Sequence, residues 1–415
     1  MKIPTIRNQR IISWIIFVPA IIVGFISLIP SVFPAWLLRS FGGIPDNIQI
    51  DPFEPGVWAY PIIIANVIVF SLLVLYFRNY LPQKIGKAIR FIFSFEVSPQ
   101  LAFVVIVILV GFYTLLSVNE LFDGKFDADY YNRVKPWLES FDLFKLPAND
   151  GDRDVGHHLQ IFFESTSMKM FGNYKVIPFI ASITLPIMTY FLTAELTKKR
   201  FAGIVAMVIV LQSSLFLFYD TGVSYPNFWI LFYLLSLYLV YKMWPLSAIS
   251  NIIAILTKGL SAIFFPVSLY FIIRSNITRK RKTYLLISYA IIVIAGAVFL
   301  LSTSTSLNPL AQKEFNLHNF VSGFAAFSTT FKDDGLILLF FIPLIFGLFI
   351  ASRKGIVHAE SVMLLLTVML FSAPFLSGFS DHQNVPYRFV PVVTFFAIGT
   401  GLLLSKLPAK SSSEQ

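Results

Sequence analysis

Residues 100–131 read QLAFVVIVILVGFYTLLSVNELFDGKFDADYY, an apolar run that changes abruptly into an acidic and aromatic segment. The run Gln100–Val118 carries no charged side chain and is long enough to cross a bilayer as a helix. The polar segment continues to Gly172 and holds 10 Asp and Glu against 6 Lys and Arg, in a chain whose net charge is +10. Long segments between spans often carry function, so an active site is expected first in residues 119–172.

The composition indicates a polytopic membrane protein. Charged residues make up 13% of the sequence, about half the fraction typical of soluble domains, and hydrophobic residues make up 56%. The absence of cysteine excludes disulfides, thiolate nucleophiles and cysteine-ligated metal centres. The excess of positive charge has no accompanying nucleic-acid motif, and most basic residues lie in short connections between apolar runs. Membrane topology explains this charge better than a nucleic-acid partner does.

Ten runs of membrane length are predicted, and the first is expected to be retained because no signal-peptide cleavage site follows it. They are Ile11–Pro30, Val57–Phe77, Gln100–Val118, Val176–Ala194, Phe201–Tyr219, Tyr225–Met243, Tyr284–Ser302, Gly335–Ala351, Val357–Ser377 and Arg388–Ser405. A further apolar stretch, Leu246–Ile273, is interrupted by Thr257-Lys-Gly. We predict that it forms two short helices that meet at Lys258. The expected fold is therefore an all-α polytopic membrane protein with about twelve membrane helices.

The distribution of basic residues predicts the orientation of the chain. When Leu246–Ile273 crosses twice, the basic connections join Lys2, Arg7 and Arg10 on the cytoplasmic side. That side then holds 20 basic and 4 acidic residues, against 12 basic and 18 acidic residues outside. Both termini are then cytoplasmic. The opposite face gathers residues 119–172, the turn at Lys258, residues 303–334 and residues 378–387.

Two carboxylates open the polar segment and are the first candidates for acid–base chemistry. Asp127 and Asp129 follow the preceding span by about ten residues, which places them just above the membrane surface. Side chains at i and i+2 do not share a helix face, so at most one of them is expected to point into a given cleft. The alternative is an ordinary solvated acidic loop. Asp220 ranks lower, because an aspartate in Tyr219-Asp-Thr-Gly is also a usual cap of the following turn.

Cationic side chains suited to binding a phosphate lie on the same predicted face. His157 and His158 precede an amphipathic run that ends in Gly172, where they can donate to an anion. Lys258 lies between two apolar helices, and intramembrane lysines usually serve a function unless they extend to the interface. Arg388 begins the last span, where its guanidinium can bind either a phosphate or lipid headgroups.

Taken in order, these features resemble the GT-C membrane glycosyltransferases, in particular the branch of the protein O-mannosyltransferases and the lipid A aminoarabinose transferases. The resemblance covers about residues 100–405. It rests on the span Gln100–Val118, Asp127-Ala-Asp-Tyr130, Gly156-His-His-Leu with Met170-Phe-Gly, Lys199-Arg-Phe-Ala-Gly-Ile-Val-Ala, Leu256-Thr-Lys-Gly and Tyr387-Arg-Phe-Val-Pro. The chain departs from the family pattern in having His157-His158 in place of Pro-Pro, and Tyr225-Pro-Asn where an acidic residue is often found.

The resemblance implies a GT-C fold with a large first catalytic outer loop. It also implies a sugar donor carried on a polyprenyl phosphate, and a glycolipid, glycan or protein hydroxyl as acceptor. Asp129 is the expected base of an inverting displacement. The expected substrate contacts are Asp127, Tyr130, His157, His158, Lys258, Tyr387 and Arg388. No cofactor and no metal are expected. A divalent ion, which is not favoured, would bind at Asp127 and Asp129.

The same resemblance divides the chain by function. Residues 1–99 are expected to add two N-terminal membrane helices, residues 100–405 to form the catalytic domain, and residues 406–415 to form a cytoplasmic tail. The expected location is the cell membrane, or the endoplasmic reticulum in a eukaryote. Two alternatives stay open: a transporter or lipid-carrier flippase, because a broken hairpin such as Leu246–Ile273 is typical of transporters, and a glycolipid-binding scaffold without catalysis.

Overall fold

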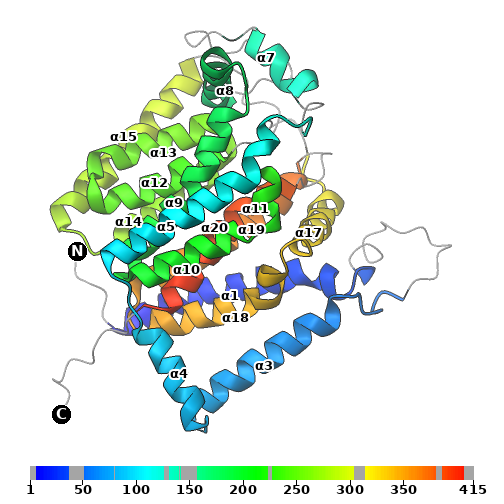
Figure 1. The fold of residues 1–415 in the computed structure, drawn as a ribbon, viewed down its shortest axis with the longest axis vertical. Helices are drawn as coiled ribbons and strands as arrows, with labels where there is room; N and C mark the ends of the chain where they lie inside the picture. Colours follow the sequence, from blue (N-terminus) through cyan, green and yellow to red (C-terminus); the bar gives the residue numbers. More distant parts are fainter. Residues whose placement is uncertain are drawn as a thin grey trace. The chain divides into compact units, whose positions relative to one another are not determined.

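The computed structural model describes residues 6–36, 51–78, 80–125, 130–139, 141, 157–222, 227–302, 314–379 and 386–405. Within these ranges the secondary structure is helical, without strands (Figure 1). Six helices there are long and apolar enough to cross a bilayer: Ile11–Val32, Ala59–Tyr76, Pro99–Leu121, Val176–Thr197, Gly335–Arg353 and Val357–Ser377. The prediction of an all-helical membrane protein is confirmed at this level. The count of about twelve membrane helices stays a prediction.

The contacts within the chain divide it into two compact units. Unit 1 comprises Met1–Val97, Leu196–Ala202 and Leu310–Gln415, and unit 2 comprises Ser98–Glu195 and Gly203–Pro309. These two units are defined by the contacts within each of them. The predicted boundary between residues 99 and 100 instead separates two added helices from a catalytic domain, and it stays a prediction.

Unit 1 is organised around its first helix, which packs against three helices from the C-terminal part of the chain. Its elements are α1 (Ile6–Val32), α3 (Ala59–Phe77), α4 (Gln83–Ser94), α17 (Leu317–Phe331), α18 (Gly335–Arg353), α19 (Val357–Ser377), η5 (Pro386–Phe389) and α20 (Val390–Leu403). Gly24 lets α1 approach α18 closely, because a Cβ there would come within 2.9 Å of the Phe341 ring. Phe17 stacks on Phe349 with ring centroids 4.3 Å apart, which holds the same pair of helices together.

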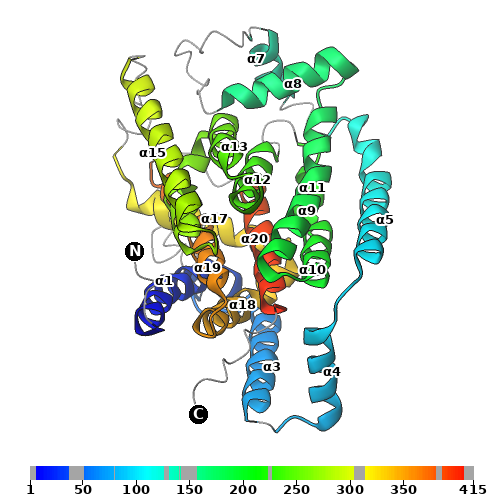
Figure 2. The same ribbon diagram turned by 90° about the vertical axis from the view of Figure 1, so that its left-hand side faces the viewer.

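Unit 2 contains the whole polar segment and most of the helices that follow it up to residue 309 (Figure 2). Its elements are α5 (Pro99–Ser117), η1 (Val118–Leu121), the π-helical turn η2 (Tyr130–Val134), α7 (Lys135–Glu139), α8 (His158–Phe171), most of α9 (Val176–Thr197) and of α10 (Arg200–Leu211), α11 (Ser214–Tyr219), α12 (Phe228–Lys242), α13 (Trp244–Thr257), η4 (Gly259–Phe264), α14 (Phe265–Arg274) and α15 (Arg279–Ser302). Helices α12 and α13 form a hairpin. The hydroxyls of Ser247 and Ser250 tie it by donating to the carbonyls of Ser236 and Phe232, at 2.9 and 2.8 Å.

Two apolar stretches are broken by local polar groups. The predicted span Phe201–Tyr219 divides into α10 and α11, because the Ser213 hydroxyl accepts from the Phe216 N–H at 3.1 Å and begins a new helix. The stretch Leu246–Ile273 divides at Lys258, which ends α13 before η4 and α14. The break lies where the sequence predicted it, and the double crossing of the membrane stays a prediction.

Candidate functional site

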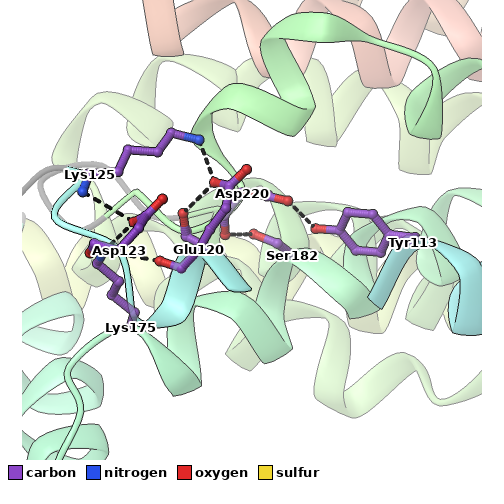
Figure 3. A network of polar contacts seen from close by, with 8 residues as sticks. Tyr113, Glu120, Asp123, Lys125, Lys175, Ser182 and Asp220 are labelled. Carbon is purple, nitrogen blue, oxygen red and sulfur yellow. Dashed lines mark hydrogen bonds and ion pairs between the residues drawn. The ribbon is translucent and has the colours of Figure 1, made fainter. Parts of the chain in front are cut away.

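The structure gathers a network of charged and hydroxyl side chains in unit 2, which we call the polar cluster (Figure 3). It is formed by Tyr113, Glu120, Asp123, Lys125, Lys175, Ser182, Asp220 and Thr221. These residues come from three places in the chain: the C-terminal end of α5 with η1, the start of α9, and the residues that follow α11. The cluster lies at the end of an apolar helix of membrane length.

Asp220 is the most deeply buried carboxylate of the polar cluster, with 1% of its surface exposed. Its Oδ2 accepts a hydrogen bond from the Tyr113 hydroxyl at 2.9 Å, and its main-chain oxygen accepts from the Ser182 hydroxyl at 2.6 Å. The Asn227 amide donates in turn to Ser182 Oγ at 3.0 Å, which fixes that hydroxyl. The second carboxylate oxygen, Oδ1, is buried without a hydrogen-bond partner. Buried polar atoms are rarely left unpaired, so this atom requires an explanation.

Burial raises the pKa of Asp220 to about 6. The negative charge of Glu120 adds to this effect, whereas hydrogen bonds from Ser117 and Tyr113 and the charge of Lys125 lower the pKa. A carboxyl group with a pKa near neutrality gains and loses a proton readily under physiological conditions. Asp220 is therefore suited to the acid–base role for which the sequence suggested Asp127 and Asp129.

The two lysines of the polar cluster are neutralised by their own neighbours. The buried Lys175 ammonium donates to the carbonyls of Glu120 and Asp123, at 3.1 and 2.8 Å, and to Asp123 Oδ1 at 3.2 Å. Lys125 forms an ion pair with the Glu120 carboxylate, whose Oε2 also accepts from the Thr221 hydroxyl at 3.1 Å. Each lysine is thus matched by one carboxylate. Ionised Asp220 remains as the unmatched charge, so the polar cluster is suited to accepting a proton rather than to binding an anion.

A second buried carboxyl group lies on α8. Glu164 is fully buried, and its Oε1 accepts from the Gln160 amide at 3.1 Å. Its Oε2 is buried without a hydrogen-bond partner, and burial raises the pKa of Glu164 well above its ordinary value. Burial therefore favours the protonated form of Glu164 over the carboxylate. Helix α8 ends at Phe171, and the following Gly172 takes the left-handed conformation with φ of 64°, which is common for a glycine that ends a helix.

The predicted substrate contacts Tyr130, His157 and His158 lie in η2 and at the N-terminus of α8 in unit 2. Tyr130 is buried in η2 and stacks on Tyr174, with ring centroids 3.8 Å apart. His157 is the residue before α8, and His158 is the first residue of that helix. The His158 ring lies 5.2 Å from the ring of Phe141. Tyr174 in turn lies next to the Lys175 ammonium of the polar cluster, 5.9 Å from ring centroid to Nζ. The role of Tyr130, His157 and His158 in binding substrate stays a prediction.

The predicted phosphate-binding cations Lys258 and Arg388 belong to different units. Lys258 is buried in unit 2, with 8% of its surface exposed, between α13 and η4. In unit 1, Arg388 lies in η5, where its Nε donates to the Tyr387 hydroxyl at 3.3 Å. Tyr387 itself is buried. Lys258 is thus buried within unit 2, and its role in binding a phosphate stays a prediction.

The expected base Asp129 and its neighbour Asp127 lie outside the described residues, and so does the Tyr225-Pro-Asn segment. Among the described residues, no group of three or more His, Cys, Asp or Glu side chains is placed to hold a metal ion.

The sequence reading ranked Asp220 low and did not single out Tyr113. The local pattern Tyr219-Asp-Thr-Gly suggested a turn cap, but the carboxylate accepts from a tyrosine 107 residues earlier in the chain. A signal was present, because each residue interrupts or directly follows an apolar helix. The contact between them depends on helix packing that the sequence does not display. No protein-family model, curated protein or solved structure matches this chain.

Proposed function

We propose that this protein is a membrane glycosyltransferase that moves a sugar from a polyprenyl phosphate to an acceptor hydroxyl on the non-cytoplasmic side. The proposal includes a GT-C-like fold of about twelve membrane helices and cytoplasmic termini. Lys258 of unit 2 and Arg388 of unit 1 are each predicted from the sequence to contact a donor phosphate. Asp127, Tyr130, His157, His158 and Tyr387 contact the substrates. One displacement at the anomeric carbon then inverts its configuration, as in one-step glycoside hydrolysis.

The observation that carries the proposal is Asp220, a buried carboxylate with one free oxygen and a pKa of about 6. Attack by a hydroxyl requires a base, and a base is most effective when its pKa lies near the working pH. Asp220 directly follows an apolar helix, the level at which the phosphate of a lipid-borne donor would lie. We therefore assign the uptake of the acceptor proton to Asp220 Oδ1. Asp129 is the competing candidate that the sequence resemblance favours.

A proton-coupled transporter is the second candidate. Asp220 and Glu164 are two buried carboxyl groups in unit 2, each with an unpartnered oxygen and a raised pKa. Proton-carrying carboxyl groups inside membrane proteins have these properties. In such a protein the polar cluster would bind and release a proton without a covalent reaction.

One experiment separates the two functions. Purified protein in detergent is incubated with radiolabelled polyprenyl-phosphate sugars and a lipid and glycan extract, and the label is followed from donor to acceptor. Transfer in detergent, where no compartment exists, supports the glycosyltransferase. Movement of labelled lipid or sugar only in sealed vesicles, and only with a pH gradient, supports the transporter. The variant Glu164→Gln adds a second distinction. It should leave sugar transfer unchanged, because Glu164 lies outside the polar cluster, and it should impair a transporter in which Glu164 carries a proton.

A further inference from the structure

An apolar groove lies in unit 1 between α1, α3 and α18. Its volume is about 920 Å³, and fourteen of its sixteen lining side chains are apolar. The exceptions are Asn66 and Ser71, both on α3. The Asn66 amide nitrogen is engaged with the carbonyls of Ile62 and Leu339, at 2.8 and 3.3 Å. All three helices are long and apolar enough to span a membrane, so the medium around the groove is lipid hydrocarbon.

The size of the groove decides what fits into it. A membrane-spanning helix about 10 Å wide fills roughly 2,400 Å³ across a hydrocarbon core about 30 Å thick. The groove is smaller than this and would hold at most part of such a helix. A volume of 920 Å³ instead lies in the range, about 300–1,000 Å³, of sites that enclose one small molecule. A flexible hydrocarbon chain is the occupant that the bilayer supplies at this depth.

Basic side chains mark one end of the groove. Two contacts show that α3 and α18 run parallel. The Asn66 amide donates to the Leu339 carbonyl, and further along both helices the ring centroids of Phe70 and Phe346 lie 5.1 Å apart. The lining residues Val74 and Ile350 therefore lie toward the same end. One helical turn beyond them come exposed Arg78 on α3, and exposed Arg353 and Lys354 at the end of α18.

Helix α4 follows the end of α3 that carries Arg78, and it adds further basic side chains there. Lys84, Lys87 and Arg90 are exposed and lie on one face of α4, while Ile85, Ile89 and Ile92 lie on the opposite face. A short helix with basic and apolar faces is typical of the boundary between headgroups and acyl chains. Figure 1 shows α4 directly after the turn that ends α3. The sequence predicts this face of the protein to be cytoplasmic, opposite the proposed sugar-transfer site.

We propose that the groove binds one anionic phospholipid of the surrounding bilayer. An acyl chain fills the space between α1, α3 and α18. The negatively charged headgroup contacts Arg78, Arg353 and Lys354, and α4 lies beside it at the level of the headgroups. This lipid is distinct from the proposed sugar donor, because the groove lies in unit 1 and its basic residues belong to the predicted cytoplasmic side.

The test is native mass spectrometry of the full-length protein titrated with phosphatidylglycerol or phosphatidylcholine of identical chains. Wild-type protein is expected to retain one phosphatidylglycerol with about 10- to 100-fold preference over phosphatidylcholine. Ser71→Trp fills the groove and is expected to reduce binding of phosphatidylglycerol about ten-fold or more. Its matched control is Leu72→Trp, because Leu72 is the next residue along α3 and does not line the groove. Val67→Phe is a second filling variant if Ser71→Trp fails to fold.

The headgroup contact is tested separately. Replacing Arg78, Arg353 and Lys354 together by glutamine is expected to abolish the preference for phosphatidylglycerol. The control replaces Arg279, Lys280 and Arg281, a basic cluster of unit 2, and is expected to retain it. Equal binding by Ser71→Trp and Leu72→Trp, or equal affinity of wild type for both lipids, overturns the proposal. So does a dimer that dissociates on Ser71→Trp, because a second copy of the chain would then cover the groove.

Discussion

Lys199 in unit 1 and Asp220 in unit 2 are both charged and both 1% exposed, yet their surroundings differ. The Lys199 ammonium donates to the carbonyls of Phe93 and Leu404, at 2.8 and 3.1 Å, and so joins distant parts of unit 1. Asp220 keeps one oxygen without a partner. A paired buried charge holds a fold together, whereas an incompletely paired one costs stability. Such costs persist chiefly at functional sites. The difference therefore directs the search for chemistry to unit 2.

Asp220→Asn is expected to produce the largest effect. Asparagine keeps the size of the side chain and an oxygen that accepts from Tyr113, but it is not a base. Turnover in the sugar-transfer assay should fall by about 10²–10⁴, with donor binding little changed. Asp129→Asn is measured alongside it. If Asp129→Asn loses turnover and Asp220→Asn does not, the base is Asp129 and Asp220 has a structural role.

Lys199→Met tests the other side of the comparison. The change removes two charge-assisted hydrogen bonds and leaves two carbonyls without a donor, so unfolding free energy should fall by about 2–4 kcal/mol. Denaturation in detergent measures this loss. Turnover per folded molecule is expected to stay at the wild-type value, because Lys199 lies outside the polar cluster. A loss of turnover with unchanged stability would show that the buried charge of unit 1 also takes part in function.

These predictions rest on contacts that the sequence revealed unevenly. The span after Ser98 and the break at Lys258 follow from apolar length and from a charge within an apolar run, and both are present. The break at Ser213 was missed, because a serine inside an apolar run gives little sign that its hydroxyl will begin a new helix. The hydrogen bond between Tyr113 and Asp220 was out of reach, since it depends on how α5 packs.

The cost of keeping Asp220 charged should appear in the pH dependence of stability. Its pKa rises from an ordinary 3.8 to about 6 on folding, so the folded state holds the proton more tightly than the unfolded state. The resulting stabilisation is fully present below the ordinary pKa and is lost as pH rises through about 6. Wild-type unfolding free energy should thus gain roughly 2–3 kcal/mol from Asp220 when pH is lowered from 7 to 4. Asp220→Asn should lack this contribution, and identical pH dependence in both proteins contradicts the assignment.

Tyr113→Phe should give the smallest effect and refine the position of Asp220. It removes the hydroxyl that donates to Oδ2 at 2.9 Å, and this bond lowers the pKa of Asp220. The pKa should therefore move upward, and the acid limb of the activity profile should move to higher pH with it. Tyr131→Phe is the control, because Tyr131 lies outside the polar cluster and is exposed. An unchanged pH profile of activity in Tyr113→Phe would show that the catalytic base is a group other than Asp220.

The central claim, that Asp220 is kept incompletely paired in order to take up a proton, is tested most directly by the pH dependence of kcat/KM for sugar transfer by the wild-type protein. A base must be deprotonated to act, so kcat/KM should be constant above pH 7 and fall about ten-fold per pH unit below about 6. A profile that stays flat down to about pH 4, the range of an ordinary aspartate, contradicts the claim and returns the role of base to Asp129.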